Sequence, residues 1–232
     1  FNEIYLAHSQ TQLDSICEGM IPPSITGTRP AGGSGSYTYQ WQKSYDNNTW
    51  SDVPGTSIDY SPVTTEAVTV WFRRVVSDGA GIVDRSFPVQ IIVHPRITGN
   101  IVGRDTTLCY NMNPDELYPL NAGPSGGTGL YYYQWEQSPD NTAWNDAAGA
   151  AAAAAYDPPA LTSTTYFHRV VSSGACTDIS SPVTVTILPA ITNNMVAADQ
   201  TICEGSLFAN LTGSAPGGGA APSYTYEWMS SS

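Results

Sequence analysis

The sequence predicts an all-β protein made of tandem β-sandwich domains, and three observations support this prediction. An aromatic strand motif occurs three times at a spacing of 93 or 94 residues, at Tyr37–Trp41, Tyr131–Trp135 and Tyr224–Trp228. The 21 glycines and 17 prolines are typical of many short strands joined by turns. The chain also lacks an amphipathic helical pattern of useful length. One period has the size of one sandwich domain, so the 232 residues hold two full repeats and a remainder.

The aromatic motif indicates where the core of each repeat lies. Side chains of a strand alternate between its faces, so Tyr37, Tyr39 and Trp41 share one face. A large aromatic ring on a buried face removes much apolar area from water. We therefore expect the last residue of each motif to anchor a core, which gives Trp41, Trp135 and Trp228. Such a face needs a second sheet across from it, which favours a sandwich.

The period also divides the chain into domains. Repeat one is predicted at 1–95, repeat two at 96–189, and a partial repeat three at 190–232 with the early strands only. The junctions at 93–98 and 188–192 are short and contain proline. Because proline fixes φ and neither junction is rich in glycine and serine, we expect limited bending and an elongated array of domains.

One segment breaks the agreement between the repeats. Ala150–Ala155 is a run of six alanines, where repeat one has Thr56–Asp59. Alanine is a strong helix former and a poor strand former. The run is either a low-complexity strand or loop, or a stretch whose native side chains are not alanine; we favour the second interpretation because every other segment agrees with its counterpart.

Charge and hydropathy exclude several classes of partner. The formal net charge is −12, so the chain should be repelled by nucleic acid and by anionic lipid. No run of 18 or more apolar residues occurs, so we expect no membrane insertion in this segment.

Taken together, the repeated motifs resemble a known family of repeats. They are Thr201–Gly205, the Tyr-x-Tyr-x-Trp strand, an Asp-Asn-x-x-Trp turn and Tyr166–Cys176. This pattern resembles the Ig-like repeats of very large cell-surface proteins of Bacteroidota, which are exported by type IX secretion and include gliding-motility adhesins. The resemblance covers the whole chain and implies Ig-like sandwiches of about seven strands on the bacterial cell surface. It is less specific for the protein, because such modules also decorate secreted enzymes and other adhesins.

The four cysteines offer no C-x-x-C metal site. Cys109 and Cys176 are predicted to form a disulfide inside repeat two. Cys17 should have no partner in its own repeat, because Gly81 stands where repeat two has Cys176. A partner for Cys203 would follow residue 232. The alternative is that all four thiols are free and buried.

No catalytic, cofactor or metal site is predicted. His8, His94 and His168 lie at unrelated places in the repeat, and His168 takes the strand position of Arg73, where we expect an exposed sheet-face residue. Catalytic nucleophile and zinc motifs are absent from the sequence. The acidic turn at Asp46–Asn48 has too few oxygens for Ca²⁺, so turn chemistry is expected there.

Two further surface features have competing interpretations. Ser15 and Thr106 each follow an aspartate, in an arrangement that resembles the Asp-Ser/Thr-x signal for O-glycosylation in Bacteroidota; the alternative is a chance match to a three-residue pattern. The aromatic residues could form a carbohydrate-stacking platform, but alternating aromatics on one strand face favour a core. For Trp50 and Trp144, which follow the turns, both a place in the core and a role in carbohydrate stacking remain open.

These observations favour a structural and adhesive function without enzymatic activity. We expect extracellular stalk or filament repeats of a large bacterial cell-surface adhesin, serving gliding motility or surface attachment. The expected partners are neighbouring repeats, with surface polysaccharide, other cell-surface proteins or copies of the chain as further candidates. One alternative is a non-catalytic accessory array of a secreted carbohydrate-active enzyme. Another is a self-assembling fibre that uses strand addition.

Overall fold

The computed structural model describes residues 4–5, 14–149, 151–197 and 199–231, and all regular elements among them are β-strands. The chain divides into two compact units. The first contains Phe1–Asn100 together with Gly123–Tyr132 and Val171–Asp178, and the second contains the remaining residues. The all-β, tandem Ig-like fold predicted from the sequence is confirmed by the strand arrangement of the two full repeats.

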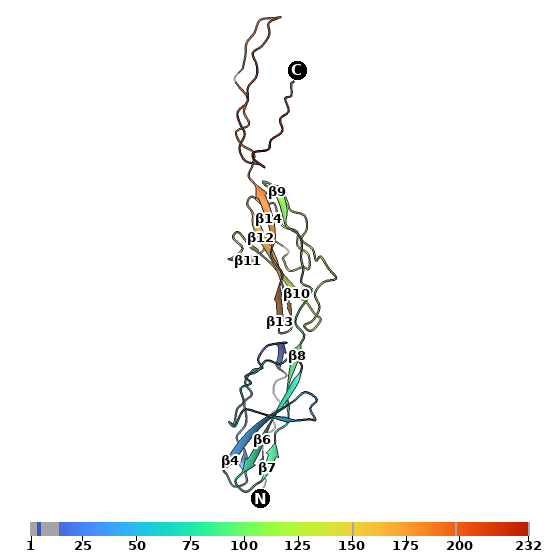
Figure 1. Cartoon of the computed structure of the whole chain (residues 1–232), viewed down its shortest axis with the longest axis vertical. Helices are drawn as coiled ribbons and strands as arrows, with labels where there is room; N and C mark the ends of the chain where they lie inside the picture. Colours follow the sequence, from blue (N-terminus) through green and yellow to red (C-terminus); the bar gives the residue numbers. More distant parts are fainter. Residues whose placement is uncertain (1–3, 6–13, 150, 198, 232) are drawn as a thin grey trace. The chain divides into compact units, whose positions relative to one another are not determined.

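Repeat one is built on one six-stranded sheet, whose strands β4, β6 and β7 are labelled in Figure 1. The sheet order is β2-β8-β6-β4-β5, with β7 beside β6. β2 runs parallel to β8, and the other pairs are antiparallel. A separate pair joins β1 (Ile4–Tyr5) to β3 (Ala31–Gly32). The strands of the main sheet are β2 (Asp14–Cys17), β4 (Tyr37–Ser44), β5 (Ser51–Val53), β6 (Val70–Asp78), β7 (Val83–Arg85) and β8 (Val89–His94).

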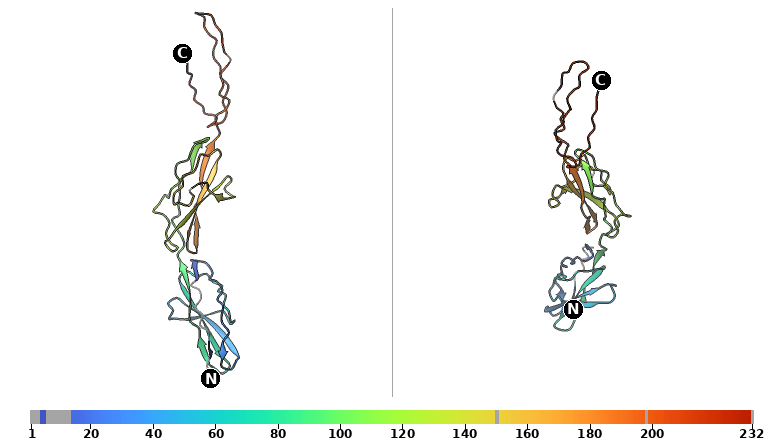
Figure 2. Two further views of the ribbon diagram at one scale, coloured as in Figure 1. Left: turned by 180° about the vertical axis from the view of Figure 1, so that it is seen from behind. Right: turned by 45° about the horizontal axis from the view of Figure 1, so that its top comes forward.

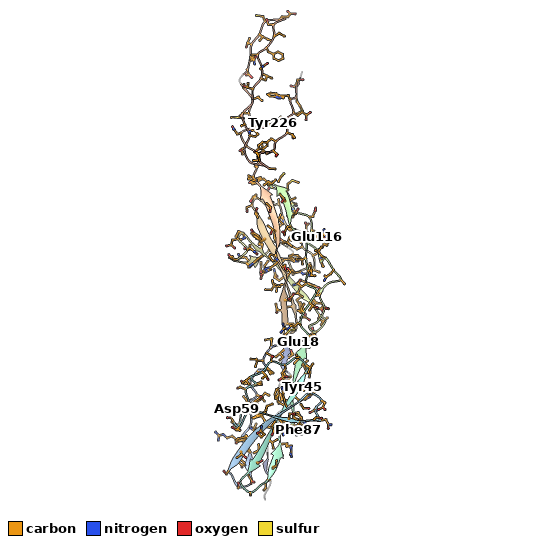
Figure 3. All side chains as sticks on the ribbon, in the orientation of Figure 1. Glu18, Tyr45, Asp59, Phe87, Glu116 and Tyr226 are labelled. Carbon is orange, nitrogen blue, oxygen red and sulfur yellow. A yellow bond between two sulfur atoms is a disulfide. The ribbon has the colours of Figure 1, made fainter. Side chains whose placement is uncertain are left out.

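The second layer of repeat one consists of the segments on either side of a single bridge between Ile25 and Tyr60. The Tyr60 ring stacks on Trp41 with ring centroids 5.4 Å apart, and so brings this layer onto the sheet. Tyr45 and Lys43 add contacts at the end of β4, because both bind the carboxylate of Glu66, at 2.8 and 3.0 Å (Tyr45 is labelled in Figure 3). The core between the layers contains Ile16, Ile25, Trp41, Val53, Tyr60, Val70, Phe72 and Ile91.

Repeat two has the same topology, seen from behind in Figure 2. Its sheet order is β11-β10-β12-β14-β9, with β13 beside β12, and β9 runs parallel to β14. Trp135 is fully buried and stacks on Tyr156, which bridges to Leu117 in the second layer. The strands are β9 (Thr106–Cys109), β10 (Tyr132–Ser138), β11 (Asn145–Asp146), β12 (Thr165–Ser173), β13 (Cys176–Ile179) and β14 (Val183–Leu188).

Residues 190–231 contain single bridges, between Thr192 and Gly217 and between Val196 and Gly213. Trp41 and Trp135 are 3% and 0% exposed, as expected of core anchors, but Trp228 is 58% exposed, so its predicted place in a core is wrong. In the full repeats the equivalent ring stacks on a tyrosine of the second layer, Tyr60 in repeat one and Tyr156 in repeat two. The described residues after 190 supply no counterpart of β6 or β12.

Candidate functional site at the junction of the repeats

The passage from repeat one to repeat two lies wholly within the first compact unit. Because β2 and β8 run parallel, they end side by side, with Cys17 paired to His94. The Glu18 amide donates to the carbonyl of His94 at 2.8 Å, and Arg96 Nε donates to the carbonyl of Glu18 at 3.1 Å (Figure 3 labels Glu18). The last residue of β2 therefore lies directly beside the linker.

A disulfide joins the two repeats at this point. Cys17, the last residue of β2, is bonded to Cys176, the first residue of β13, with a Cα–Cα distance of 4.9 Å and a sequence separation of 159. Cys176 is fully buried, and its sulfur lies 3.4 Å from the Pro95 carbonyl oxygen and 3.8 Å from that of His94. The bond thus covers the linker from one side.

This finding corrects the predicted pairing of Cys109 with Cys176, because Cys109 is a free, exposed thiol. Cys109 is the last residue of β9 and lies beside Leu188, at the end of the sheet where β12 begins. Cys176 follows the last residue of β12, at the opposite end of the sheet. The nine residues of β12 separate the two positions by roughly 25 Å at about 3.3 Å per residue. A disulfide needs Cα atoms within about 7 Å. The expectation that Cys17 has no partner in its own repeat agrees with the structure.

A glycine loop of repeat two contacts the same linker. The Gly127 amide donates to the Pro95 carbonyl at 2.8 Å, and Thr98 and Ser125 exchange two backbone hydrogen bonds of 2.9 Å. Gly126 has a φ of +92°, and a Cβ added there would clash with the Arg96 carbonyl oxygen. Only glycine combines this backbone conformation with so close an approach. This loop of repeat two therefore packs against the linker.

A buried arginine fixes the two layers of each repeat. Arg74 donates to the carbonyls of Thr28 and Ile58 at 2.6 and 2.8 Å, and its guanidinium lies 5.3 Å from the centre of the Tyr39 ring. Burial lowers the pKa of Arg74. Since its observed partners are carbonyls and rings, this arginine serves the packing of the two layers.

Repeat two has the same buried arginine, and the alanine run supplies a carbonyl group that it binds. Arg169 donates to the Ala154 carbonyl at 2.5 Å, and Trp135 Nε1 donates to that of Ala153 at 3.1 Å. Both contacts use backbone oxygens, as Trp41 does with Ser57 at 3.0 Å. The identity of these side chains therefore does not affect these hydrogen bonds, although Ala151 does enter the core.

The tryptophans after the turns lie over the outer sheet face. The Trp50 ring covers the Arg73 guanidinium at 4.1 Å, and the Trp144 ring stacks on His168 at 3.7 Å. His168 is 6% exposed and lies 2.6 Å from Glu136, so the expectation of an exposed residue is wrong. Strand periodicity placed His168 on the correct face, but it could not show that a ring from the turn covers that face.

The acidic turns use their carboxylates locally. Asp46 accepts hydrogen bonds from the backbone amides of Asn48 and Thr49 at 2.8 and 2.6 Å, and Asp140 accepts from those of Thr142 and Ala143 at 2.9 Å each. These amides hold the pKa of both carboxyl groups far below the ordinary value. Turn chemistry therefore accounts for the acidic residues at this position.

The remaining predictions concern the surface. Ser15 is exposed at the end of the sheet in β2, and Thr106 is half-buried in β9, so glycosylation of either residue stays a prediction. Within the described residues, no three potential ligands from histidine, cysteine, aspartate or glutamate gather into a metal site. No helix in the described part of the chain is long and apolar enough to cross a membrane.

Comparison with known proteins identifies the repeats. Residues 7–95 and 98–189 each match a family described as a domain of unknown function, DUF8696. The chain belongs to this family. The two DUF8696 matches lie close to the repeats expected at 1–95 and 96–189. No curated protein matches the chain.

Several solved structures are similar to the tandem DUF8696 domains. Titin domains I67–I69 are 12% identical with a TM-score of 0.47, covering 83% of this chain and 68% of theirs. Fibronectin(III)-like modules of CbhA from Clostridium thermocellum are 10% identical with a TM-score of 0.35, covering 79% of this chain and 93% of theirs. Immunoglobulin domains 1–5 of Sidekick-1 are 13% identical with a TM-score of 0.35, covering 81% of this chain and 38% of theirs.

The disulfide between Cys17 and Cys176 indicates the compartment of the protein. Disulfides persist in oxidising compartments and are rare in the cytosol, so the Cys17–Cys176 bond suggests an extracellular domain.

Proposed function

We propose that these DUF8696 domains are load-bearing repeats of an extracellular bacterial array, within a large cell-surface adhesin that serves surface attachment or gliding motility. The observation that carries this proposal is the disulfide between consecutive repeats, Cys17–Cys176. A binding or catalytic domain can function with a flexible linker. A repeat that transmits force benefits from a covalent connection beside the linker.

The position of the bond defines a path for tension. Pulling on the chain loads β2, and the disulfide passes that load from Cys17 to Cys176 in β13. From there the load continues through β14, which is the last strand of repeat two. The residues between the two cysteines are bypassed, so tension cannot extend them while the bond is intact.

Single-molecule force spectroscopy tests this path. At full extension, about 3.5 Å per residue over the separation of 159 gives roughly 550 Å of chain that the bond withholds. Pulling the 232-residue chain from its ends should therefore yield about 550 Å less contour length when oxidised than when reduced. The C17A/C176A variant should give the longer extension in both conditions. Equal extension of the oxidised and reduced protein would refute the load path.

The resemblance to Bacteroidota surface repeats supports a proposal for the setting of the array. We propose a location on the bacterial cell surface after type IX secretion, with neighbouring repeats as the first partners and surface polysaccharide, other surface proteins or copies of the chain as further ones. Immunolabelling of intact cells tests the location. Labelling only after lysis would contradict it.

A further inference from the structure

We propose that Cys109 is one half of a second inter-repeat disulfide, and that its partner is a cysteine at the Cys176 position of the repeat that follows repeat two. That position falls after residue 232. The proposal rests on the proposed role of the chain as an array of consecutive repeats. It concerns a residue that the Cys17–Cys176 bond leaves free.

The first support is the identical place of the two thiols in their sheets. Cys17 ends β2 and pairs in parallel with His94, the last residue of β8. Cys109 ends β9 and pairs in parallel with Leu188, the last residue of β14. Each thiol therefore lies where its repeat passes into the next linker, and Cys109 is exposed there.

The second support is that the next linker makes the same contacts. At the first junction the Gly127 amide donates to the Pro95 carbonyl at 2.8 Å, and at the second the Gly219 amide donates to that of Pro189 at 2.7 Å. The proline carbonyl is thus bound by an equivalent glycine loop at both places.

Further contacts of the glycine loop are also equivalent at the two linkers. The bridge between Thr98 and Ser125 recurs between Thr192 and Gly217. Tyrosine hydroxyls donate to the loop carbonyls in both cases, from Tyr131 to Gly126 at 2.8 Å and from Tyr224 to Gly218 at 2.6 Å. The early part of repeat three therefore contacts its linker as the early part of repeat two does.

These equivalences define where the partner sulfur lies. Cys176 contacts the carbonyl oxygens of His94 and Pro95, whose counterparts are those of Leu188 and Pro189. A cysteine over these two oxygens would meet Cys109 as Cys176 meets Cys17. Bond formation removes two protons and two electrons from the two thiols, and a disulfide-bearing oxidant accepts them and is reduced to two thiols.

The same scheme accounts for all four cysteines. Cys17, Cys109 and Cys203 occupy equivalent sequence positions in the three repeats, and Cys176 alone occupies the position that receives the bond. Gly81 stands at that position in repeat one, so repeat one receives no such bond from a repeat before it. The cysteines thus link each repeat to the next and do not close single domains.

A chain with one added repeat tests the proposal. Residues 1–189 are followed directly by a second copy of 96–189, which keeps the proline of the linker in register, and the protein is refolded in a glutathione redox buffer. Non-reducing peptide mapping should find Cys17 bonded to Cys176 of the first copy, and Cys109 of the first copy bonded to Cys176 of the second. The matched control replaces Cys176 of the second copy by glycine, as at Gly81, and should leave Cys109 open to alkylation.

The proposal would be overturned if Cys109 of the first copy were alkylated while the added copy resists proteolysis, which shows that the added copy is folded. Differential alkylation of the native protein on its cells gives an independent decision, because Cys109 should be labelled only after reduction. Labelling before reduction would overturn the proposal even if the added copy fails to fold. The force measurement on Cys17–Cys176 is unaffected by either result, so the two proposals can fail separately.

Discussion

Removing the Cys17–Cys176 bond should destabilise the protein strongly, and the change to make is the double variant C17A/C176A. Cys176 is fully buried and Cys17 is half-buried, so alanine is the smallest change that avoids burying a hydroxyl group at either site. The expected effect arises mainly in the unfolded chain, because the bond closes a loop with a sequence separation of 159.

The magnitude follows from the chain-entropy relation. For a separation of 159, the relation gives about 5 kcal/mol at 25 °C, near the upper end of measured values for disulfides. With a urea dependence of about 2 kcal/mol per molar, the unfolding midpoint should fall by roughly 2.5 M. The effect should reach both repeats, because the closed loop contains most of each.

Urea unfolding followed by tryptophan fluorescence measures the change, because both repeats contain buried tryptophans, Trp41 and Trp135. The variant C109A/C203A is the matched control, because it also removes two cysteines but only free, exposed ones, and its midpoint should not move. Dithiothreitol should lower the midpoint of the wild type and leave C17A/C176A unchanged. A midpoint shift below about 0.3 M in C17A/C176A would refute the reasoning.

Three further outcomes follow from the same structure. Trp135→Ala should cost about 3–5 kcal/mol in urea unfolding, whereas Trp228→Ala should change stability little because that ring is 58% exposed. Gly126→Ala should destabilise the protein more than Gly129→Ala. Both glycines have a positive φ, but only a Cβ at Gly126 would clash with a carbonyl oxygen. Equal urea midpoints of the two variants would contradict this. The pKa of Asp46 and of Asp140 is depressed in the folded state. Their contribution to the free energy of unfolding should therefore be present above the ordinary pKa of 3.8 and be lost as pH falls through the lower pKa of the folded state. NMR titration of the two carboxyl groups near pH 3.8 tests this.

The sequence predicted well what period-2 patterns determine. Val70, Phe72 and Val76 alternate along β6 and are all buried, and the aromatic motif placed Trp41 and Trp135 in equivalent cores. The pattern could not show the second layer, since its segments meet through single bridges such as Ile25 to Tyr60. It also gave no sign that a turn residue, Trp144, covers the outer sheet face at His168.

The cysteine pairing was missed for a different physical reason. The spacing of Cys109 and Cys176 fits a loop inside one domain, but spacing says nothing about the end of the sheet at which each thiol lies. Pairing β9 in parallel with β14 puts Cys109 at the exit of its repeat, whereas the turn after β12 puts Cys176 at the entrance. Two thiols at opposite ends of one sandwich cannot meet, but an exit thiol lies beside the entrance of the next repeat. In a tandem array, strand direction therefore decides whether cysteines close a domain or connect neighbours, and the parallel pairing of β2 and β9 in these two repeats favours connection.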